Sequence, residues 1–160
     1  MQKLTLKHCI EQTHELDIPV YGDMNWRGDC NIEDADLASF FAWVRFAYPQ
    51  YEMLIFHPEN EMPVNGGASF AYHTKSKNKG RLDGLADVIC LPVKHGAPAF
   101  VMELKRVDFA KSCSGQKRQK GYMRQLMCLK SQIEHGAFAC ICLGLDNAKQ
   151  AFAEYVERYG

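Results

Sequence analysis

The chain has 160 residues, of which 47% are hydrophobic and 24% charged, and its 19 basic side chains balance its 19 acidic ones. These values predict one globular domain over residues 1–160, with an N-terminal extension at 1–32 and a core at about 33–158. No apolar run approaches the roughly 18 residues of a membrane span, the N-terminus lacks a signal-peptide core, and no Cys-x-x-Cys pair occurs. The composition argues against a membrane protein, a disulfide-rich secreted protein and a zinc site, and it favours a cytoplasmic protein with reduced thiols.

The first half of the chain predicts helices and one strand. Residues 4–15 can form a short helix in an otherwise irregular N-terminal segment. Asn31 is a helix-capping residue, acids follow it in the first turn, and apolar residues then recur at helical spacing as far as Pro49. Residues 51–57 predict a strand, and residues 58–84 predict a long polar loop of the kind that is functional or mobile.

The chain continues with two apolar runs on either side of a turn-forming segment, which are residues 86–91 and 99–105. A hairpin centred near His95 would place Asp87 opposite Glu103. Lys105 lies two residues after Glu103 and therefore shares its face of the strand. Two facing carboxylates repel unless a cation lies between them, and oxygen ligands suit Mg²⁺ or Mn²⁺. The spacing predicts a metal site, and the alternative is a set of surface charges on an edge strand.

A long helix that ends before Gly136 is expected after the hairpin, starting from Ser112 or Ser114. Residues 137–143 are a continuous apolar run, which predicts a buried strand. A last helix follows, with two candidate capping residues, Asp146 and Asn147. The strand–helix–strand order implies a parallel crossover. The expected fold class is therefore α/β, with a four-stranded mixed sheet flanked by helices.

The balanced charge is unevenly distributed along the chain. Basic residues dominate two segments, 73–81 and 104–132, whereas acidic residues gather in 11–36 and in the tail. A basic surface of this kind suits the phosphate backbone of nucleic acids, and the alternative is a solvated loop and helix face. The residues expected to contact nucleic acid are Lys77, Lys79, Arg81, Lys111, Lys117, Arg118, Lys120 and Arg124.

Several of these pieces, in this order, resemble the VRR-NUC family of PD-(D/E)xK nucleases, which includes small phage nucleases and the nuclease domain of the Fanconi-associated nuclease. Glu103-Leu104-Lys105 matches the core triplet of that family. Gly80 followed by Gly84-Leu85-Ala86-Asp87 resembles its Gly-x-x-x-Gly-x-Pro-Asp stretch, with Ala86 in place of proline, and His57-Pro58-Glu59-Asn60-Glu61 resembles its turn after the first strand. The resemblance covers roughly residues 31–158 and implies a core like that of restriction endonucleases.

The resemblance also implies roles for the acidic pair and the lysine. Asp87, Glu103 and Leu104 would bind the divalent metal, and Lys105 would position or help activate the attacking water. Glu33 would reach the same site from the first helix, or Asp36 in its place. Leu37 stands four residues after Glu33, where the family often has glutamine.

A glutamine in the helix after the triplet completes the site of this family. Three glutamines compete for that position: Gln116 and Gln119 by their place in the helix, and Gln125 by its distance from Gly136. His57, at a strand end, would either contact the site or a phosphate, or have a structural role.

The function implied is that of a Mg²⁺- or Mn²⁺-dependent endodeoxyribonuclease with no small-molecule cofactor and no membrane partner. By analogy with the small phage members, the resemblance implies a homodimer that cuts branched DNA, foremost the four-way (Holliday) junction. The setting implied is the cytoplasm, at the nucleoid, for a bacterial or phage-encoded protein. The alternatives are a flap- or nick-directed nuclease of replication and repair, and a DNA-binding module without activity, against which the intact acidic pair and lysine argue.

Overall fold

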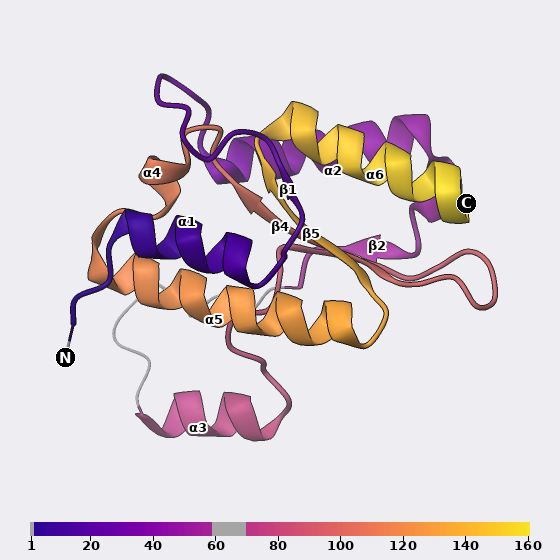
Figure 1. Ribbon diagram of the computed structural model, residues 1–160. Helices are drawn as coiled ribbons and strands as arrows, with labels where there is room; N and C mark the ends of the chain where they lie inside the picture. The colour runs from indigo at the N-terminus through magenta and orange to yellow at the C-terminus, as the bar shows by residue number, and fades with distance from the viewer. Residues whose placement is uncertain (1, 59–69) are drawn as a thin grey trace.

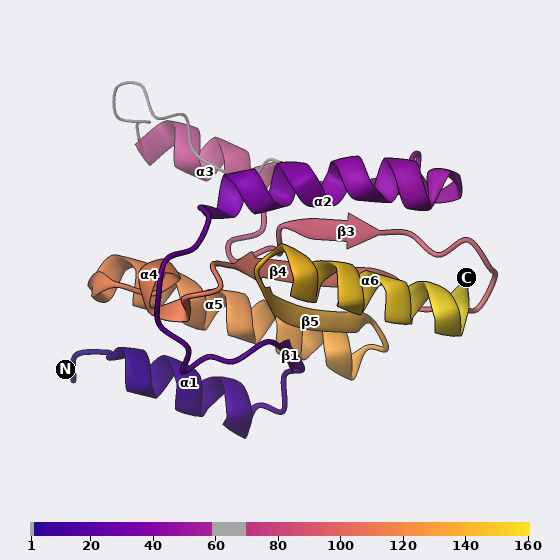
Figure 2. The same cartoon turned by 90° about the horizontal axis from the view of Figure 1, so that it is seen from above.

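The computed structural model describes residues 2–58 and 70–160, which form a five-stranded mixed sheet between two layers of helices (Figure 1, Figure 2). The strand order is β1-β5-β4-β3-β2. The strands are β1 (Val20–Tyr21), β2 (Ile55–Phe56), β3 (Val88–Cys90), β4 (Phe100–Lys105) and β5 (Phe138–Leu143). The helices are α1 (Leu6–Glu15), α2 (Glu33–Ala47), the 3-10 turn η1 (Pro49–Tyr51), α3 (Phe70–Asn78), α4 (Phe109–Ser112), α5 (Gly115–Glu134) and α6 (Leu145–Tyr159).

The pairing of the central strands follows the sequence prediction. β3 and β4 form the antiparallel hairpin, with Val88 opposite Met102, and β2 extends it as an antiparallel edge strand. β4 and β5 pair in parallel, as the predicted crossover requires. The predicted four-stranded sheet is wrong in its strand count, because β1 adds a fifth strand parallel to β5. That strand has only two residues, Val20 and Tyr21, and it pairs with residues far away in the sequence, which no local pattern reveals.

The two faces of β4 pack against different helices. Its even-numbered residues pack in a core with α2 and α6, whereas Val101 packs in a second core with α1 and α5. Because side chains alternate along a strand, Glu103 and Lys105 share the face of Val101 and point toward α5. Two charged side chains therefore occupy positions under a helix, where a charge is stable only when it is paired or bound.

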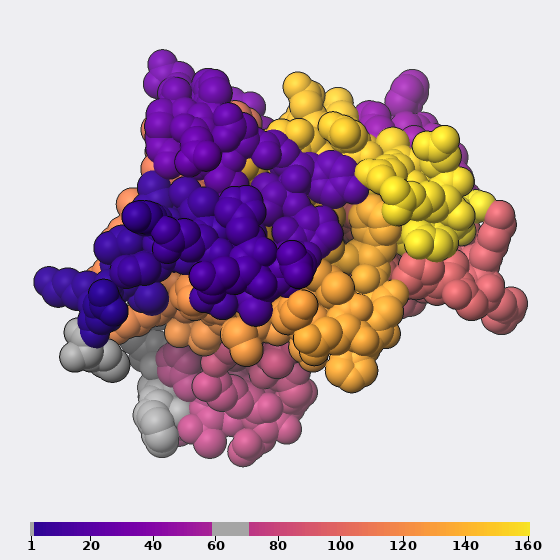
Figure 3. Space-filling view, in the orientation of Figure 1, coloured from indigo at the N-terminus to yellow at the C-terminus, as the bar shows by residue number. Residues whose placement is uncertain are grey.

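The N-terminal segment, predicted as largely irregular, contains the expected helix and packs into the second core. α1 runs beside α5 (Figure 1, Figure 2), and its residues Cys9 and Thr13 are fully buried. The hydroxyls of Thr13 and Tyr122 are 2.6 Å apart, and the main chain of Leu4 exchanges two hydrogen bonds with the Gln116 side chain. In Figure 3 the N-terminal segment, in indigo, covers much of this side of the molecule. α1 thereby occupies one flank of α5.

The predicted starts of two helices are wrong. Asn31 does not cap α2, because its amide donates a hydrogen bond to Asp36 at 3.2 Å. Neither Asp146 nor Asn147 caps α6, because Gly144 precedes that helix with a φ of 85°. This backbone conformation favours glycine, so the chain leaves β5 and enters α6 without a polar cap.

The region before the hairpin also departs from the prediction. The strand predicted at 51–57 is limited to β2, because η1 takes up the residues before it. The predicted loop 58–84 contains α3 in its described part, whereas residues 59–69, including the Glu59-Asn60-Glu61 part of the predicted turn, lie outside the described residues. α3 carries few apolar residues, so no helical periodicity marks it in the sequence. Within the described residues, no helix has the length and apolarity needed to cross a membrane.

Candidate active site

The hairpin places two carboxylates side by side. Continuing its register one residue beyond the pair Val88–Met102 puts Asp87 opposite Glu103, as the sequence predicts. Asp87 Oδ2 accepts a hydrogen bond of 2.8 Å from the main-chain N–H of Leu104, which ties the carboxylate to β4. The negative charge of Asp87 raises the pKa of Glu103, as expected of two neighbouring carboxyl groups.

Glu103 and Lys105 form a buried ion pair beneath α5. Only 1% of Glu103 and 8% of Lys105 are exposed, and Lys105 Nζ lies 2.9 Å from Glu103 Oε1. The ammonium group also lies 5.9 Å from the centre of the Tyr122 ring. Glu103 Oε2 is buried and has no hydrogen-bond partner among the described residues. A buried carboxylate oxygen without a partner is costly, so this atom suits coordination to a cation.

Glu33 approaches the same place from the first turn of α2. Its Oε1 accepts a hydrogen bond from the Ser112 hydroxyl, and Ser112 Oγ in turn accepts one of 2.8 Å from the main-chain N–H of Arg106. These bonds join α2 to the segment that follows β4. Asp36, the alternative acid, is 2% exposed and accepts its hydrogen bond from Asn31. The geometry therefore brings Glu33, and not Asp36, to the acidic pair.

Three carboxylates surround one ammonium group in this cluster. Burial raises the pKa of Asp87 and of Glu103, although the positive charge of Lys105 lowers both. Burial lowers the pKa of Lys105, but the carboxylates of Glu103, Glu33 and Asp87 outweigh it and raise that pKa above its ordinary value. Burial thus disfavours the ionised forms of Asp87 and Glu103. A divalent cation bound beside them would favour the ionised carboxylates.

The donor atoms fit a hard cation. Asp87 and Glu103 supply carboxylate oxygens, and Leu104, whose main-chain N–H bonds to Asp87, follows Glu103 directly and offers its main-chain oxygen. The described residues contain no group of three or more His, Cys, Asp or Glu side chains that could hold one metal ion. Mg²⁺ commonly uses one or two carboxylates and completes its coordination with water and substrate oxygens. The residues present therefore fit Mg²⁺ or Mn²⁺ better than zinc, which favours histidine and cysteine.

Two cavities open onto this cluster. The first, the Lys105 cavity, has a volume of about 420 Å³ and is lined by Glu33 and Lys105. The second, the Asp87 cavity, has a volume of about 790 Å³ and includes Asp87 in its lining. Gly121 and Gln125 of α5 line both. We call the two cavities together the groove, and its acidic centre lies where they meet.

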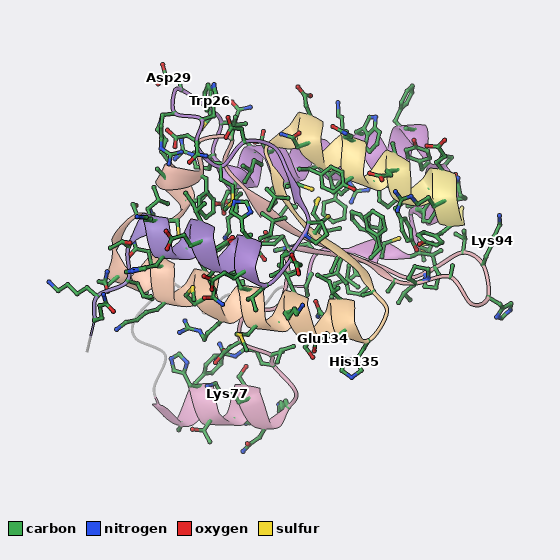
Figure 4. The ribbon with its side chains drawn as sticks, viewed as in Figure 1. Trp26, Asp29, Lys77, Lys94, Glu134 and His135 are labelled. Carbon is green, nitrogen blue, oxygen red and sulfur yellow. The ribbon has the colours of Figure 1, made fainter. Side chains whose placement is uncertain are left out.

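Six of the eight basic residues predicted to contact nucleic acid line the groove. They are Lys111 and Arg118 in the Lys105 cavity, and Lys77, Arg81, Lys117 and Arg124 in the Asp87 cavity. Lys79 and Lys120 are exposed and line neither cavity. Asp83, which the sequence analysis did not consider, lies 2.9 Å from Lys77 and 3.2 Å from Arg81. The positive charge of α3, which Lys77 marks in Figure 4, is thus partly balanced within the groove.

Of the three candidate glutamines, Gln125 is the one that lines the groove. Gln116 bonds to the main chain of Leu4, and the Gln119 amide donates to the Cys113 carbonyl at 3.1 Å. Both belong to the contact that holds α1 and α4 against α5. The sequence offered Gln125 as one of three candidates for the site glutamine. Because α1 packs on the other flank of α5, Gln125 is the candidate that faces the groove.

Several residues of the site were missed or given another role in the sequence analysis. Ser112 was considered only as a helix cap, yet it bonds to Glu33, and this depends on α2 lying next to α4. His57 Nδ1 lies 2.5 Å from the main-chain oxygen of Asp87, so the ring bonds to the loop that carries the acid. Tyr122 and Gly121 carried no recognisable signal, because their neighbours come from other elements.

The fold has a counterpart among solved structures. A structure described as "VRR_NUC domain protein" matches this chain with a TM-score of 0.58 and 18% sequence identity, over 82% of this chain and 92% of that chain. The chain has the fold of a VRR_NUC domain protein. The predicted fold family is therefore confirmed, although neither a family model nor a curated protein sequence matches the chain. At this identity the likeness concerns the VRR_NUC fold, so the roles of the site residues rest on the geometry described above.

Proposed function

We propose that the protein is a metal-dependent nuclease that hydrolyses phosphodiester bonds in DNA. The observation that carries this proposal is the buried cluster of Asp87, Glu103 and Lys105, with its unpartnered carboxylate oxygen. A pure binding surface for DNA gains nothing from carboxylates beside phosphate, because like charges repel. Basic residues line both cavities around this acidic centre, and the fold is shared with a VRR_NUC domain protein.

The residues divide the work of phosphodiester hydrolysis as follows. Asp87 and Glu103, with the main-chain oxygen of Leu104, would hold Mg²⁺ or Mn²⁺. When bound, the cation polarises the phosphate and lowers the pKa of a water molecule. Lys105, kept protonated by the carboxylates around it, donates to the negative charge that develops on the phosphate. Glu33 and Gln125 face the same space and orient water or phosphate by hydrogen bonds.

The direct test is cleavage of labelled DNA with Mg²⁺ or Mn²⁺ by the wild-type protein and Asp87→Asn. The amide retains an acceptor for the Leu104 N–H but removes the charge. Asp29→Asn is the control, because Asp29 lies at a loop tip (Figure 4), its side chain is fully exposed, and its ion pair with Lys111, at 4.0 Å, lies outside the acidic pair. We expect cleavage by the wild type and by Asp29→Asn, and none by Asp87→Asn. Equal cleavage by Asp87→Asn would refute the assigned metal site, and no cleavage by any of them would refute the nuclease.

We further propose that the substrate is branched DNA, foremost the four-way junction, cut by a homodimer. Phe46 and Met53 are 89% and 91% exposed, and they lie at the end of α2 and just after η1. Large apolar side chains so exposed suit a contact between two copies. A two-fold dimer would match the symmetry of the junction. The groove contains basic residues on both sides of the acidic centre, as cleavage within a strand requires.

A substrate panel separates this reading from its alternatives. Four-way junction, flap, nicked and plain duplex DNA are compared at equal concentration, and the mass of the protein in solution is measured by light scattering. Paired symmetric cuts in the junction by a protein of twice the chain mass support the junction proposal. Preferred cutting of flaps or nicks, or a monomeric mass, would replace it with a repair-type nuclease.

A further inference from the structure

A glycine occupies the middle of the longest helix. Gly121 is the seventh of the 20 residues of α5, far from either helix end. Glycine inside a helix is less favourable than alanine by about 1 kcal/mol, because it loses the most backbone freedom on folding. A residue with this cost usually has a reason in the conformation of the backbone, in close packing or in a ligand.

Neither the backbone nor the packing supplies that reason. Gly121 is helical and is not among the glycines with positive φ. A Cβ placed on it would meet only Arg124 Nη2 among the described residues, at 3.9 Å, which is ordinary contact with a flexible side chain. Gly84 is the contrast, because its φ is 83° and a Cβ there would lie 2.8 Å from the main chain of Arg124. The fold thus requires glycine at Gly84, but it does not require glycine at Gly121.

The position of Gly121 in the groove is specific. Gly121 and Gln125, one helical turn apart, are the two residues that line both cavities. Lys105 belongs to one of these cavities and Asp87 to the other, so the acidic centre lies beside the same boundary. The missing side chain of Gly121 leaves the helix surface bare at this one position, with the Gln125 side chain one turn further along.

Basic residues stand on both sides of this bare surface. Lys117 lies one turn before Gly121 and Arg124 about one turn after it, and both line the Asp87 cavity. Arg118 lines the Lys105 cavity and is exposed. A polyanionic chain that crosses α5 at Gly121 would therefore meet cations in each cavity and no side chain at Gly121 itself.

We propose that one polynucleotide strand crosses α5 at Gly121, with its sugar–phosphate backbone against the helix and nucleotides held in both cavities. The scissile phosphate then lies at the boundary, between Asp87 and Lys105. Gly121 is a binding residue whose lack of a side chain lets the backbone approach. This inference rests on the proposed nuclease function and adds the path of the strand to it.

The test uses Gly121→Ala and Gly121→Leu, with Ser131→Ala and Ser131→Leu as controls. Ser131 is exposed on α5 and lines neither cavity of the groove. Three quantities are measured on the full chain: melting temperature, affinity for a fluorescent single-stranded 20-nucleotide oligonucleotide without divalent metal, and cleavage of the same strand with Mn²⁺. We expect Gly121→Ala to raise the melting temperature by about 2–4 °C through its helix propensity. We expect Gly121→Leu to weaken strand binding and cleavage by about tenfold or more, since a steric conflict of 1–3 kcal/mol has this size.

A higher melting temperature in Gly121→Ala, together with weaker strand binding in Gly121→Leu, would show that glycine serves binding at this position and not the fold. If Gly121→Leu binds and cuts the strand as well as the wild type does, the strand path is refuted. The strand path is also refuted if both Gly121 variants have a lower melting temperature than the wild type, because the fold would then require this glycine. The proposed nuclease function is unaffected by either result. If the wild type does not cut at all but Gly121→Leu alone loses strand binding, the nuclease fails and the path of the strand stands. Equal losses in the Ser131 variants would also refute the proposal.

Discussion

Asp87 is a buried carboxyl group whose effect on the stability of the folded protein depends on pH. Burial raises its pKa in the folded protein, so the folded state binds a proton more tightly than the unfolded chain does. The tighter binding of this proton stabilises the folded protein fully below the ordinary aspartate pKa of about 3.9. This stabilisation is lost as the pH rises through the raised pKa of Asp87. Glu103 has a pKa raised in the same direction by burial. Both shifts predict that the metal-free protein becomes less stable from mildly acidic toward neutral pH.

Asp87→Asn removes one of these charges without removing the acceptor for Leu104 N–H. We expect the variant, free of metal, to gain roughly 1–3 kcal/mol in free energy of unfolding at pH 8, the usual cost of a poorly compensated buried polar group. The gain should vanish near pH 4, where the wild-type carboxyl is protonated. Urea unfolding at both pH values checks this.

Mn²⁺ should raise the melting temperature of the wild type and of Asp29→Asn, but not that of Asp87→Asn. A wild type whose melting temperature does not respond to Mn²⁺ would contradict the metal site.

Lys105 is the residue whose chemical role the electrostatics define most sharply. Three carboxylates raise its pKa, so it remains an ammonium ion and acts as a donor rather than as a base. We expect Lys105→Met to reduce the cleavage rate by about 10²–10³, the usual effect of losing one donor to a developing negative charge. Lys105→Arg keeps the positive charge and should retain more activity than Lys105→Met. Single-turnover rates distinguish the roles, because a general base would be lost equally in both variants.

At the scale of elements, the segment that carries Asp87 is held against α5 by a close backbone contact. Gly84 has a φ of 83°, and a Cβ on it would lie 2.8 Å from the Arg124 main chain, whereas Gly80, with a φ of 93°, has no described atom within 4 Å of such a Cβ. Gly80→Ala therefore tests the positive φ alone, and Gly84→Ala tests the φ and the contact together. We expect Gly80→Ala to cost about 1 kcal/mol and Gly84→Ala clearly more, with a loss of cleavage only in Gly84→Ala. Equal unfolding free energies for the two variants would show that the contact does not hold this segment.

The same elements show what the sequence could predict. The hairpin register was accessible because turn formers centre it near His95, and that register alone sets Asp87 opposite Glu103. β1 was not accessible, because its two residues form a strand only by pairing with β5. The choice among the glutamines stayed open because it depends on which flank of α5 is covered. The segment just before α1 covers the flank that holds Gln116, through Leu4. Local patterns thus gave the acidic centre, whereas the groove around it depends on contacts between distant segments.

At the scale of the whole molecule, a net charge of zero conceals a separation of charge. The 19 basic and 19 acidic side chains cancel in sum, yet eight lysine and arginine residues and only four acidic residues line one groove. Affinity for DNA should therefore depend on the groove and not on the overall charge. Each phosphate contact that is neutralised releases counterions, which lowers the logarithm of the affinity with the logarithm of salt concentration by about 0.9 per contact on duplex DNA.

Lys117→Gln and Lys94→Gln remove the same charge from two places. Lys117 lines the Asp87 cavity and is exposed, and Lys94 lies in the β3–β4 connection at the far end of the molecule from α4 (Figure 1, Figure 4). We expect Lys117→Gln to reduce the salt dependence of junction binding by about one contact, and Lys94→Gln to leave it unchanged. Fluorescence anisotropy between 50 and 300 mM salt measures both slopes. Equal slopes for the two variants would mean that the electrostatic field of the whole protein, and not the groove, attracts DNA. The assignment of the groove as the DNA-binding site would then fail, even if Asp87 proved essential for cleavage.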